Sequence, residues 1–333
     1  MQRLKNLCMV AALGAIVMGG SLLQSTSAYA ASTINVKAGG TTLSSALTLA
    51  KYGDTIAISG TVTSGSVVVP AGVIISGKSG AGKINFSSTT GSSRGLTINT
   101  TGSTITDLEL YGAADNGIYM EGSSNRLTNL KVHGNHDAGV QLSNGAANNT
   151  LSNVYSYSNA DAKGENADGF AIKLHSGAGN KLIDCTAEGN SDDGYDLYAA
   201  HGAVTFTRCH AINNGNCGGI KGDGNGFKVG GVDNKTPGKP AHMDPLNHVL
   251  IDCTATGNTN SGFDRNNQNG VVTMTGCIGK NNGIKNFNFP LTGTPSALGG
   301  KTVPFGVAIM KNCTSINGTN NITGATLSGC IGL

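Results

Sequence analysis

The strongest constraint on the fold of this 333-residue chain is a repeat in which an apolar residue is followed three positions later by another apolar residue or a cysteine. The repeated pairs are Leu127/Leu130, Leu151/Val154, Leu182/Cys185, Phe206/Cys209, Leu250/Cys253, Met274/Cys277, Met310/Cys313 and Leu327/Cys330. A period of about 24 residues with occasional insertions is typical of a solenoid, because each coil buries its apolar face only against its neighbours. The repeat therefore predicts an all-β, right-handed parallel β-helix.

A second series of matching positions runs through the glycines. In each member a glycine precedes a large apolar residue and then a variable residue, and the members are Asn116–Tyr119, Ala138–Gln141, Asp168–Ala171, Asp193–Asp196, Asn225–Lys228 and Ser261–Asp264. Because side chains alternate between the two faces of a strand, the apolar residues point inward and their successors point outward. We therefore expect at least two strands per coil, with Asp196, Lys228 and Asp264 side by side on one exposed face.

The N-terminal part predicts a lid for the solenoid. Leu43, Leu47 and Ala50 have the spacing of a short amphipathic helix, which would cover the open first coil. Strand-like segments follow over Val67–Val69, Val73–Ile75, Leu96–Ile98 and Ile105–Leu110. Stretches that exceed the period predict loops, which carry function on many rigid scaffolds, at roughly 155–167, 213–247 and 280–306.

Residues 1–30 have the three parts of a secretory signal peptide. A short basic start precedes an apolar core over Val10–Leu23, and Ala28–Ala30 has the small-x-small pattern of a cleavage site. We expect residues 31–333 to form a single β-helical domain that is secreted and extracellular. No other stretch is apolar enough to predict a membrane crossing.

Charge and composition narrow the possible partners. Removal of the two cations in the signal segment lowers the formal charge from +3 to +1, and the chain has no basic tail or run of Lys and Arg. Nucleic acid is therefore not a predicted partner. We expect a monomer without membrane association.

Seven cysteines follow the signal segment, and six of them occupy the slot that holds Leu130 and Val154 in earlier coils. They are predicted to be small buried apolar residues stacked inside the helix. A disulfide between adjacent coils stays open, because strand spacing falls within the permitted Cα range. The absence of a CxxC pair does not favour zinc.

Four carboxylates are predicted to converge within about two rungs of the stack. The position three residues before the outward column places Asp168 directly on Asp193, while Asp192 and Asp196 lie on the same rung as Asp193. Such close packing of like charges is costly unless a cation neutralises them, and an all-oxygen set without His or Cys suits Ca²⁺. The alternative is a solvated acidic turn, since Asp is an ordinary turn residue.

Lys228 lies between Asp196 and Asp264 in the outward column. An Asp–Lys–Asp column can be a simple cross-strand salt bridge. The functional alternative is a general base, because a nearby dication engages the aspartates and lowers the pKa of the amine.

Three segments resemble the signature segments of family 9 polysaccharide lyases, which are secreted β-helical pectate lyases: Ala167–Ala171, Asn190–Leu197 and Gly224–Gly231. The match is tightest over about 155–265. The resemblance assigns calcium ligation to four aspartates and the role of catalytic base to a lysine: Asp168, Asp192, Asp193, Asp196 and Lys228.

The resemblance implies β-elimination on polygalacturonate, with Ca²⁺ acidifying the C5 proton through the C6 carboxylate and Lys228 abstracting it. Because the substrate is an acidic polysaccharide, the cations Lys173, Lys221 and Arg265 are predicted to bind its carboxylates. Asp264 is grouped with these predicted substrate-binding residues as the neighbour that would orient or tune Lys228. The same residues are compatible with a lyase of another uronate polymer such as alginate, or with a non-catalytic glycan-binding β-helix. Endo or exo action, and galacturonan or rhamnogalacturonan as substrate, stay open.

Overall fold

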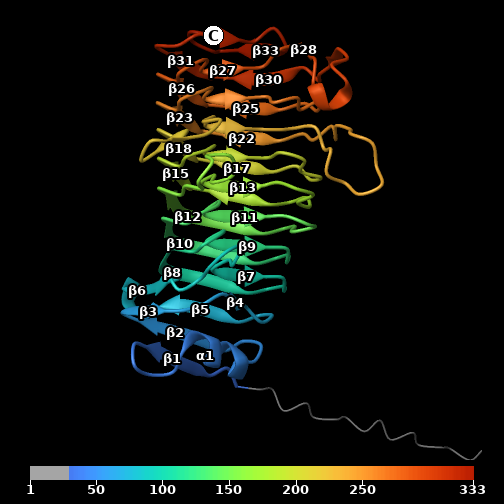
Figure 1. The fold of residues 1–333 in the computed structure, drawn as a ribbon. Helices are drawn as coiled ribbons and strands as arrows, with labels where there is room; N and C mark the ends of the chain where they lie inside the picture. Colours follow the sequence, from blue (N-terminus) through green and yellow to red (C-terminus); the bar gives the residue numbers. More distant parts are fainter. Residues whose placement is uncertain (1–29) are drawn as a thin grey trace, which may run out of the picture. The chain divides into compact units, whose positions relative to one another are not determined.

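The computed structural model describes residues 30–333, which form a parallel β-helix whose coils stack along one axis (Figure 1). The predicted signal peptide, apart from Ala30, lies outside the described residues. Residues 31–333 are one compact unit. Among the described residues, no helix has the length and apolar character that a membrane crossing requires.

Two long parallel sheets form the walls of the β-helix. The nineteen-stranded sheet contains β1 (Thr33–Lys37), β2 (Thr55–Ser59), β3 (Thr61–Thr63), β5 (Ile74–Gly77), β6 (Gly82–Asn85), β8 (Thr104–Tyr111), β10 (Arg126–His133), β12 (Thr150–Tyr157), β14 (Lys181–Ile183), β15 (Thr186–Glu188), β17 (Thr205–Thr207), β18 (His210–Ile212), β22 (Val249–Ile251), β23 (Thr254–Thr256), β25 (Thr273–Thr275), β26 (Ile278–Lys280), β30 (Ala308–Lys311), β31 (Thr314–Ile316) and β33 (Ala325–Ser328). The ten-stranded sheet contains β4 (Val67–Val68), β7 (Leu96–Ile98), β9 (Ile118–Met120), β11 (Val140–Leu142), β13 (Phe170–Ile172), β16 (Tyr195–Asp196), β21 (Phe227–Lys228), β24 (Phe263–Asp264), β27 (Phe287–Asn288) and β32 (Asn320–Asn321).

Small elements complete the described chain. Two antiparallel hairpins pair β19 (Asn216–Cys217) with β20 (Ile220–Lys221) and β28 (Thr292–Gly293) with β29 (Val303–Pro304). Both hairpins lie in stretches that exceed the repeat period, as the period predicts for loops. Two 3₁₀ turns, η1 (Lys78–Gly80) and η2 (Ser296–Leu298), lie in connecting segments.

The predicted lid is confirmed as the helix α1 (Leu43–Leu49). The Thr42 hydroxyl accepts a hydrogen bond from the Ser45 N–H at 3.1 Å and caps the helix, which leaves fewer free N–H groups at its first turn. Leu43, Ala46 and Leu47 are buried against the first coils, so α1 covers apolar surface that an open solenoid end would expose.

The three-residue spacing of the apolar repeat has a conformational cause. Leu127 and Leu130 are both buried, although simple alternation would place them on opposite faces of β10. Asn129 between them has φ of +54°, and this left-handed residue bends the strand so that both leucines point inward. Matching positions in other coils are also left-handed: Asp107, Asn153, Asp184, Arg208, Asp252, Gly276 and Asn312.

The cysteine prediction is confirmed for five of the six slot positions. Cys185, Cys209, Cys253, Cys277 and Cys313 are fully buried, and all seven cysteines after the signal segment are free thiols. Cys330 is only half-buried, on a coil where β33 pairs with β30 alone among the described strands of the sheet. The thiols therefore contribute packing rather than cross-links.

A column of buried asparagines, which the repeat analysis did not anticipate, runs along the turns of the helix. Its members are Asn135, Asn159, Asn190, Asn214, Asn258, Asn282 and Asn286. The Nδ2 group of each of the first six donates to Oδ1 of the next at 2.8–3.0 Å. These bonds satisfy polar groups that would otherwise be unpaired in the interior.

A stack of aromatic rings fixes the ten-stranded sheet from inside. The rings of Phe170, Tyr195, Phe227, Phe263 and Phe287 lie 4.4–5.0 Å apart with nearly parallel planes. Their inward position confirms the predicted alternation, and their successors in the sequence point away from the core.

Candidate functional site

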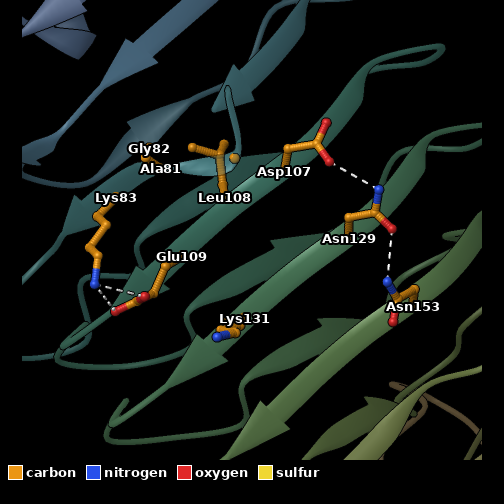
Figure 2. Close-up of a pocket in the computed structure, with 10 residues that line it drawn as sticks. Ala81, Gly82, Lys83, Asp107, Leu108, Glu109, Asn129, Lys131 and Asn153 are labelled. Carbon is orange, nitrogen blue, oxygen red and sulfur yellow. Dashed lines mark hydrogen bonds and ion pairs between the residues drawn. The ribbon is translucent and has the colours of Figure 1, made fainter. Parts of the chain in front are cut away.

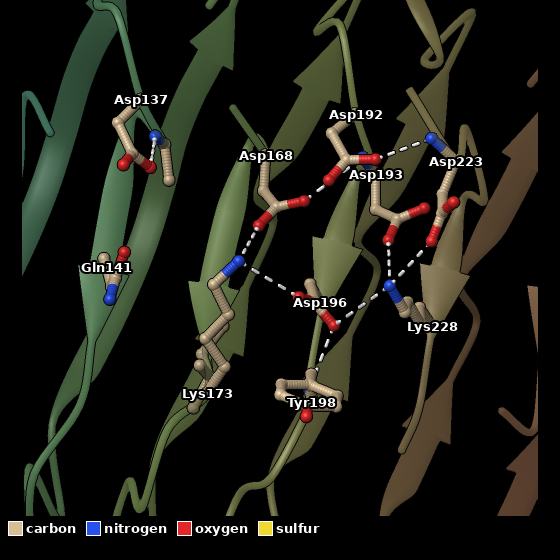
Figure 3. A network of polar contacts seen from close by, with 12 residues as sticks. Asp137, Gln141, Asp168, Lys173, Asp192, Asp193, Asp196, Tyr198, Asp223 and Lys228 are labelled. Atoms are coloured by element: carbon tan, nitrogen blue, oxygen red, sulfur yellow. Dashed lines mark hydrogen bonds and ion pairs between the residues drawn. The ribbon is translucent and has the colours of Figure 1, made fainter. Parts of the chain in front are cut away.

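The candidate site lies on three adjacent strands of the ten-stranded sheet, β13, β16 and β21 (Figure 3). The pairing register places Ala171 beside Asp196, Asp196 beside Lys228, and Lys228 beside Asp264. The predicted outward column is therefore confirmed as a register. Asp168, Asp192 and Asp193 precede the same strands and lie at their N-terminal ends.

The predicted convergence of carboxylates is present. Asp168, Asp192 and Asp193 each offer an oxygen within 4.8 Å of the others, and all three are buried. Asp196 is also buried and lies in β16, on the same coil as Asp192 and Asp193. Four carboxylates in so small a volume repel one another unless positive charge is placed among them.

Backbone groups hold these carboxylates in fixed orientations. The N–H of Asp193 donates to Asp168 Oδ1 at 3.1 Å, and the N–H of Tyr198 donates to Asp196 Oδ1 at 2.9 Å. Asn225 donates from both its N–H and its Nδ2 to Asp193 Oδ1, at 2.7 and 2.9 Å. These hydrogen bonds within the protein fix the orientation of the carboxylates, so the cluster is preorganised for a ligand.

Lys173 lies inside the acidic cluster rather than in an open groove. Its Nζ is 2.7 Å from Asp168 Oδ2 and 3.1 Å from Asp196 Oδ2, and the residue is only 6% exposed (Figure 3). The prediction that Lys173 contacts substrate does not fit this position, because both carboxylates already occupy its ammonium group. Lys173 instead neutralises part of the charge of the cluster.

Lys228 occupies the solvent side of the same cluster. Its Nζ lies 3.1 Å from Asp193 Oδ2, 3.0 Å from Asp223 Oδ2 and 4.0 Å from Asp196 Oδ1. The side chain is 13% exposed, whereas the side chains of Asp193 and Asp196 are 0% and 4% exposed, so Lys228 is the most open to solvent of these three residues. This is the position that a base acting on an external substrate requires.

Asp223 is a member of the site that the repeat analysis missed. Its side chain is 64% exposed and pairs with Lys228, while its N–H donates to Asp192 Oδ1 at 2.7 Å. The residue lies in the insertion before β21, outside the repeated segment, so its position could not be read from the period. The one sequence feature that links Asp223 to the site is its position immediately before Gly224–Gly231, the segment that contains Lys228.

The other predicted substrate-binding residues have different positions. Asp264 lies beside Lys228 in register, but its carboxylate accepts from Asn288 Nδ2 and from the N–H of Asn266, both at 2.7 Å. No ion pair joins Asp264 to Lys228 among the described contacts. The register of the Asp–Lys–Asp column is therefore confirmed, but a cross-strand salt bridge is absent on the Asp264 side, because Asp264 turns toward the next coil.

Arg265 is wrong as a groove residue, because its side chain is fully buried. Its Nη1 donates to the carbonyl of Gly306 at 2.7 Å, and its guanidinium carbon lies 5.5 and 5.3 Å from the ring centroids of Phe289 and Phe305. It joins C-terminal segments together. Lys221, by contrast, is exposed and lines a hollow with Asp192 and Asp223, so its contact with substrate stays a prediction.

Burial and mutual repulsion shape the acidity of the cluster. Burial raises the pKa of Asp168 well above its ordinary value, and burial together with Asp193 raises the pKa of Asp192 to about 8. Burial also raises the pKa of Asp193, to about 6, against the effect of Lys228. For Asp196, the attraction of Lys228 and Lys173 outweighs burial and lowers the pKa.

The same charges act on the lysine. Burial alone would lower the pKa of Lys228, but the carboxylates of Asp196, Asp193 and Asp223 outweigh it and raise the pKa well above its ordinary value. These carboxylates therefore favour the ammonium form of Lys228.

The residues present fit a bound dication. The five carboxylates of the site face two ammonium groups, which leaves a formal charge of −3 when all are ionised. Asp193 Oδ2 is fully buried and accepts no hydrogen bond from the described residues, with Lys228 Nζ as its charged neighbour. Hard carboxylate oxygens in excess of the available cations are the ligands that Ca²⁺ prefers.

A second hollow, on the nineteen-stranded sheet, has a different character (Figure 2). Asn153 Nδ2 donates to Asn129 Oδ1, and Asn129 Nδ2 donates to Asp107 Oδ1, each at 2.9 Å. Lys83 pairs with Glu109 at 2.9 Å. Its polar groups satisfy one another in coil-to-coil ladders, which is a structural arrangement rather than a converging site.

Comparisons with known proteins agree with this geometry. A family model described as "Pel9A-like, right handed beta helix region" matches residues 24–321. The chain is 37% identical over 215 residues to "Pectate lyase L" of Paenibacillus polymyxa (strain SC2), which covers 59% of this chain and 46% of that protein. It is 34% identical over 188 residues to "Pectate lyase PEL9" of Emericella nidulans, covering 48% and 44%.

Among solved structures, "Crystal structure of pectate lyase Pel9A" matches with a TM-score of 0.75 and 26% identity, covering 89% of this chain and 78% of that one. The predicted right-handed handedness of the β-helix is thereby confirmed. The chain spans less than half the length of the two curated relatives described above.

Proposed function

The chain belongs to the Pel9A-like right-handed β-helix family, the family 9 polysaccharide lyases, and from this premise we propose that it is a calcium-dependent pectate lyase that cleaves polygalacturonate by β-elimination. The observation that carries the proposal is the placement of Lys228 at the solvent edge of a buried group of aspartates whose negative charge exceeds that of the neighbouring lysines. Relatives that bear the name pectate lyase support the choice of substrate.

Asp168, Asp192, Asp193 and Asp196 would hold the calcium ion. When bound, the ion would supply Lewis-acid polarisation of the C6 carboxylate of the sugar, which makes the C5 proton more acidic. Lys173 keeps two of these aspartates oriented and balances part of their charge. The backbone donors described above keep the four carboxylates in place as substrate enters and leaves.

Lys228 would act as the general base. Once the charge of Asp193 and Asp196 is engaged by a dication, the main cause of its raised pKa is removed, and the neutral amine becomes accessible at alkaline pH. Its Nζ takes the C5 proton, the electron pair forms the C4–C5 double bond, and the C4–O bond breaks. The released oxygen gains a proton from solvent and the Lys228 ammonium group returns its proton to solvent, so no net water is consumed.

The substrate and the signal-like N-terminus are consistent with a secreted, extracellular enzyme. Polygalacturonate is a polymer too large to enter a cell intact, so the enzyme would meet it outside. We expect the enzyme to act as a monomer.

Replacement of Lys228 by Ala tests the proposal. Loss of a general base should lower turnover by roughly 10²–10⁴-fold, measured as ultraviolet absorbance of the unsaturated product on polygalacturonate. Calcium binding and the unfolding midpoint should be retained. The matched control is Lys131→Ala, which removes an exposed lysine from β10 on the other sheet.

Two results would contradict the mechanism: activity of Lys228→Ala within tenfold of wild type, and wild-type activity that survives removal of calcium by EDTA. Parallel assays on alginate and on rhamnogalacturonan decide the substrate. Product formation on alginate alone would replace pectate with another uronate polymer. Calcium-dependent sugar binding without any unsaturated product would replace the enzyme with a glycan-binding module.

A further inference from the structure

A second cluster of ligand-type side chains lies at the other end of the same rungs. His175 follows β13, His201 follows β16, and Asp233, His242 and Asp244 belong to the long segment between β21 and β22. These residues are far apart in the sequence and none belongs to the repeat. The aspartate cluster lies before these strands, whereas the histidines lie after them.

The three imidazoles converge on one carboxylate oxygen. Asp233 Oδ2 lies 3.0 Å from Nε2 of His201, 3.3 Å from Nε2 of His175 and 3.7 Å from Nε2 of His242. Asp244 Oδ2 lies 3.6 Å from Nε2 of His201 and 3.9 Å from Nε2 of His242. Ligands of a tetrahedral Zn²⁺ with bonds of about 2.0–2.1 Å are separated by roughly 3.3 Å, and Asp233 Oδ2 lies close to that spacing from each of the three Nε2 atoms.

The hydrogen bond of His242 leaves its Nε2 as the ring nitrogen available to a metal ion. Its Nδ1 lies 3.0 Å from the carbonyl oxygen of Pro240, and a carbonyl can only accept, so Nδ1 carries the proton. In the neutral ring, Nε2 then presents a lone pair toward Asp233 and Asp244. A dication between that lone pair and the carboxylates would bind both, and a backbone carbonyl on the other ring nitrogen is the usual support of a metal-bound histidine.

We propose that His175, His201, His242 and Asp233 bind a transition-metal dication, Zn²⁺ being the best fit, with Asp244 beside it. Imidazole nitrogens with a carboxylate suit Zn²⁺, whereas Ca²⁺ takes oxygen ligands. Two carboxylates among neutral imidazoles also match the charge of a dication. The proposal does not depend on the pectate lyase assignment.

The role that the fold gives this ion is structural. Four protein ligands complete a tetrahedral site, which is the closed arrangement of structural zinc. Asp233 and His242 also form a backbone bridge, with N–H to carbonyl bonds of 2.8 and 3.0 Å in the two directions. The ion would therefore fasten a looped segment to the coils that carry His175 and His201. That segment also contacts the turn that follows β16, since the Tyr198 hydroxyl donates to Asn234 Oδ1 at 2.6 Å.

The test is a zinc titration of the chelator-stripped protein against a chromophoric competitor, with excess calcium present to saturate the aspartates. We expect one tightly bound Zn²⁺ per chain and a higher unfolding temperature in its presence. His201→Ala should weaken zinc binding by at least about 100-fold. The matched control His136→Ala removes an exposed histidine outside the cluster and should leave the affinity unchanged.

Three outcomes would overturn the proposal: no zinc bound, equal zinc affinity in His201→Ala and wild type, or zinc that excess calcium displaces, which would place it on the aspartates. If His201→Ala does not fold, His242→Ala repeats the test from the looped segment, where its side chain is 30% exposed. Co²⁺ provides an independent readout, because tetrahedral imidazole ligation produces intense visible absorption. That absorption should be present in wild type and absent in His242→Ala, and its absence in wild type would also overturn the proposal.

Discussion

Replacement of Asp223 by Asn probes the charge that controls the proposed base. Asp223 Oδ2 lies 3.0 Å from Lys228 Nζ, and its exposed side chain can become an amide without leaving a buried cavity. The N–H that supports Asp192 belongs to the backbone and is unchanged by the substitution. The change therefore removes one negative charge beside Lys228 and leaves the aspartate cluster in place.

The size of the effect follows from Coulomb's law. Two unit charges 3.0 Å apart interact by about 1.4 kcal/mol in a medium with the dielectric constant of water, which corresponds to about one pKa unit. Asp223 helps to raise the pKa of Lys228, so its loss lowers that pKa. Because the base must be a neutral amine, the acid limb of the pH–activity profile should move to lower pH by about one unit.

The measurement is kcat/KM on polygalacturonate as a function of pH at saturating calcium. Asp184→Asn is the matched control, because it removes the same charge from an exposed ion pair with Arg208 on the other sheet. High salt should shrink the shift in Asp223→Asn, since the Asp223 carboxylate is exposed. An acid limb that stays in place, moves upward, or moves equally in both variants would refute the assignment of Lys228 as the titrating base.

Two further predictions concern stability. His248 is buried, its Nδ1 accepts from the N–H of Val204 at 3.1 Å, and burial lowers its pKa from 6.5 to about 3. The unfolded state therefore binds the proton first, and the free energy of unfolding falls as pH drops below about 6.5, by about 3 kcal/mol at about pH 4. His248→Asn should remove this acid sensitivity, measured by denaturant unfolding as a function of pH. Equal acid sensitivity in His248→Asn and wild type would contradict the reasoning. Asn214→Ala should cost about 3 kcal/mol at neutral pH by unpairing its buried neighbours, whereas exposed Asn247→Ala should change stability little.

The fold could be predicted from the sequence because every coil of a solenoid repeats the same pattern of inward-facing and outward-facing residues. Leu127 and Leu130 identify the inner wall, and Phe227 with Lys228 identify an inward and an outward position on the same strand. Parallel pairing between neighbouring coils then places matching residues side by side. Asp196 and Lys228 could be brought together in this way without any knowledge of the loops.

The positions of loop residues could not be predicted from the repeat period. Asp223 and His242 lie in stretches that exceed the period, and nothing in the repeat says where such a segment returns to the stack. The prediction that Asp264 and Arg265 bind substrate does not fit the structure for a different reason. Their register was predicted correctly, but the direction of their side chains depends on partners such as Asn288 and Gly306. Side-chain direction is decided by local hydrogen bonds, which a period does not encode.

The aromatic stack links the fold to the proposed chemistry. The outward position of Asp196 and Lys228 depends on Tyr195 and Phe227 facing inward, because a slip of one residue would send every side chain of the strand to the opposite face. The ring centroids of Tyr195 and Phe227 lie 4.4 Å apart, so such a slip would expose two buried aromatic rings and bury a charged pair in their place. Both changes are strongly unfavourable. The interior therefore fixes the separation of base and carboxylates, and that separation is what the proposed elimination requires.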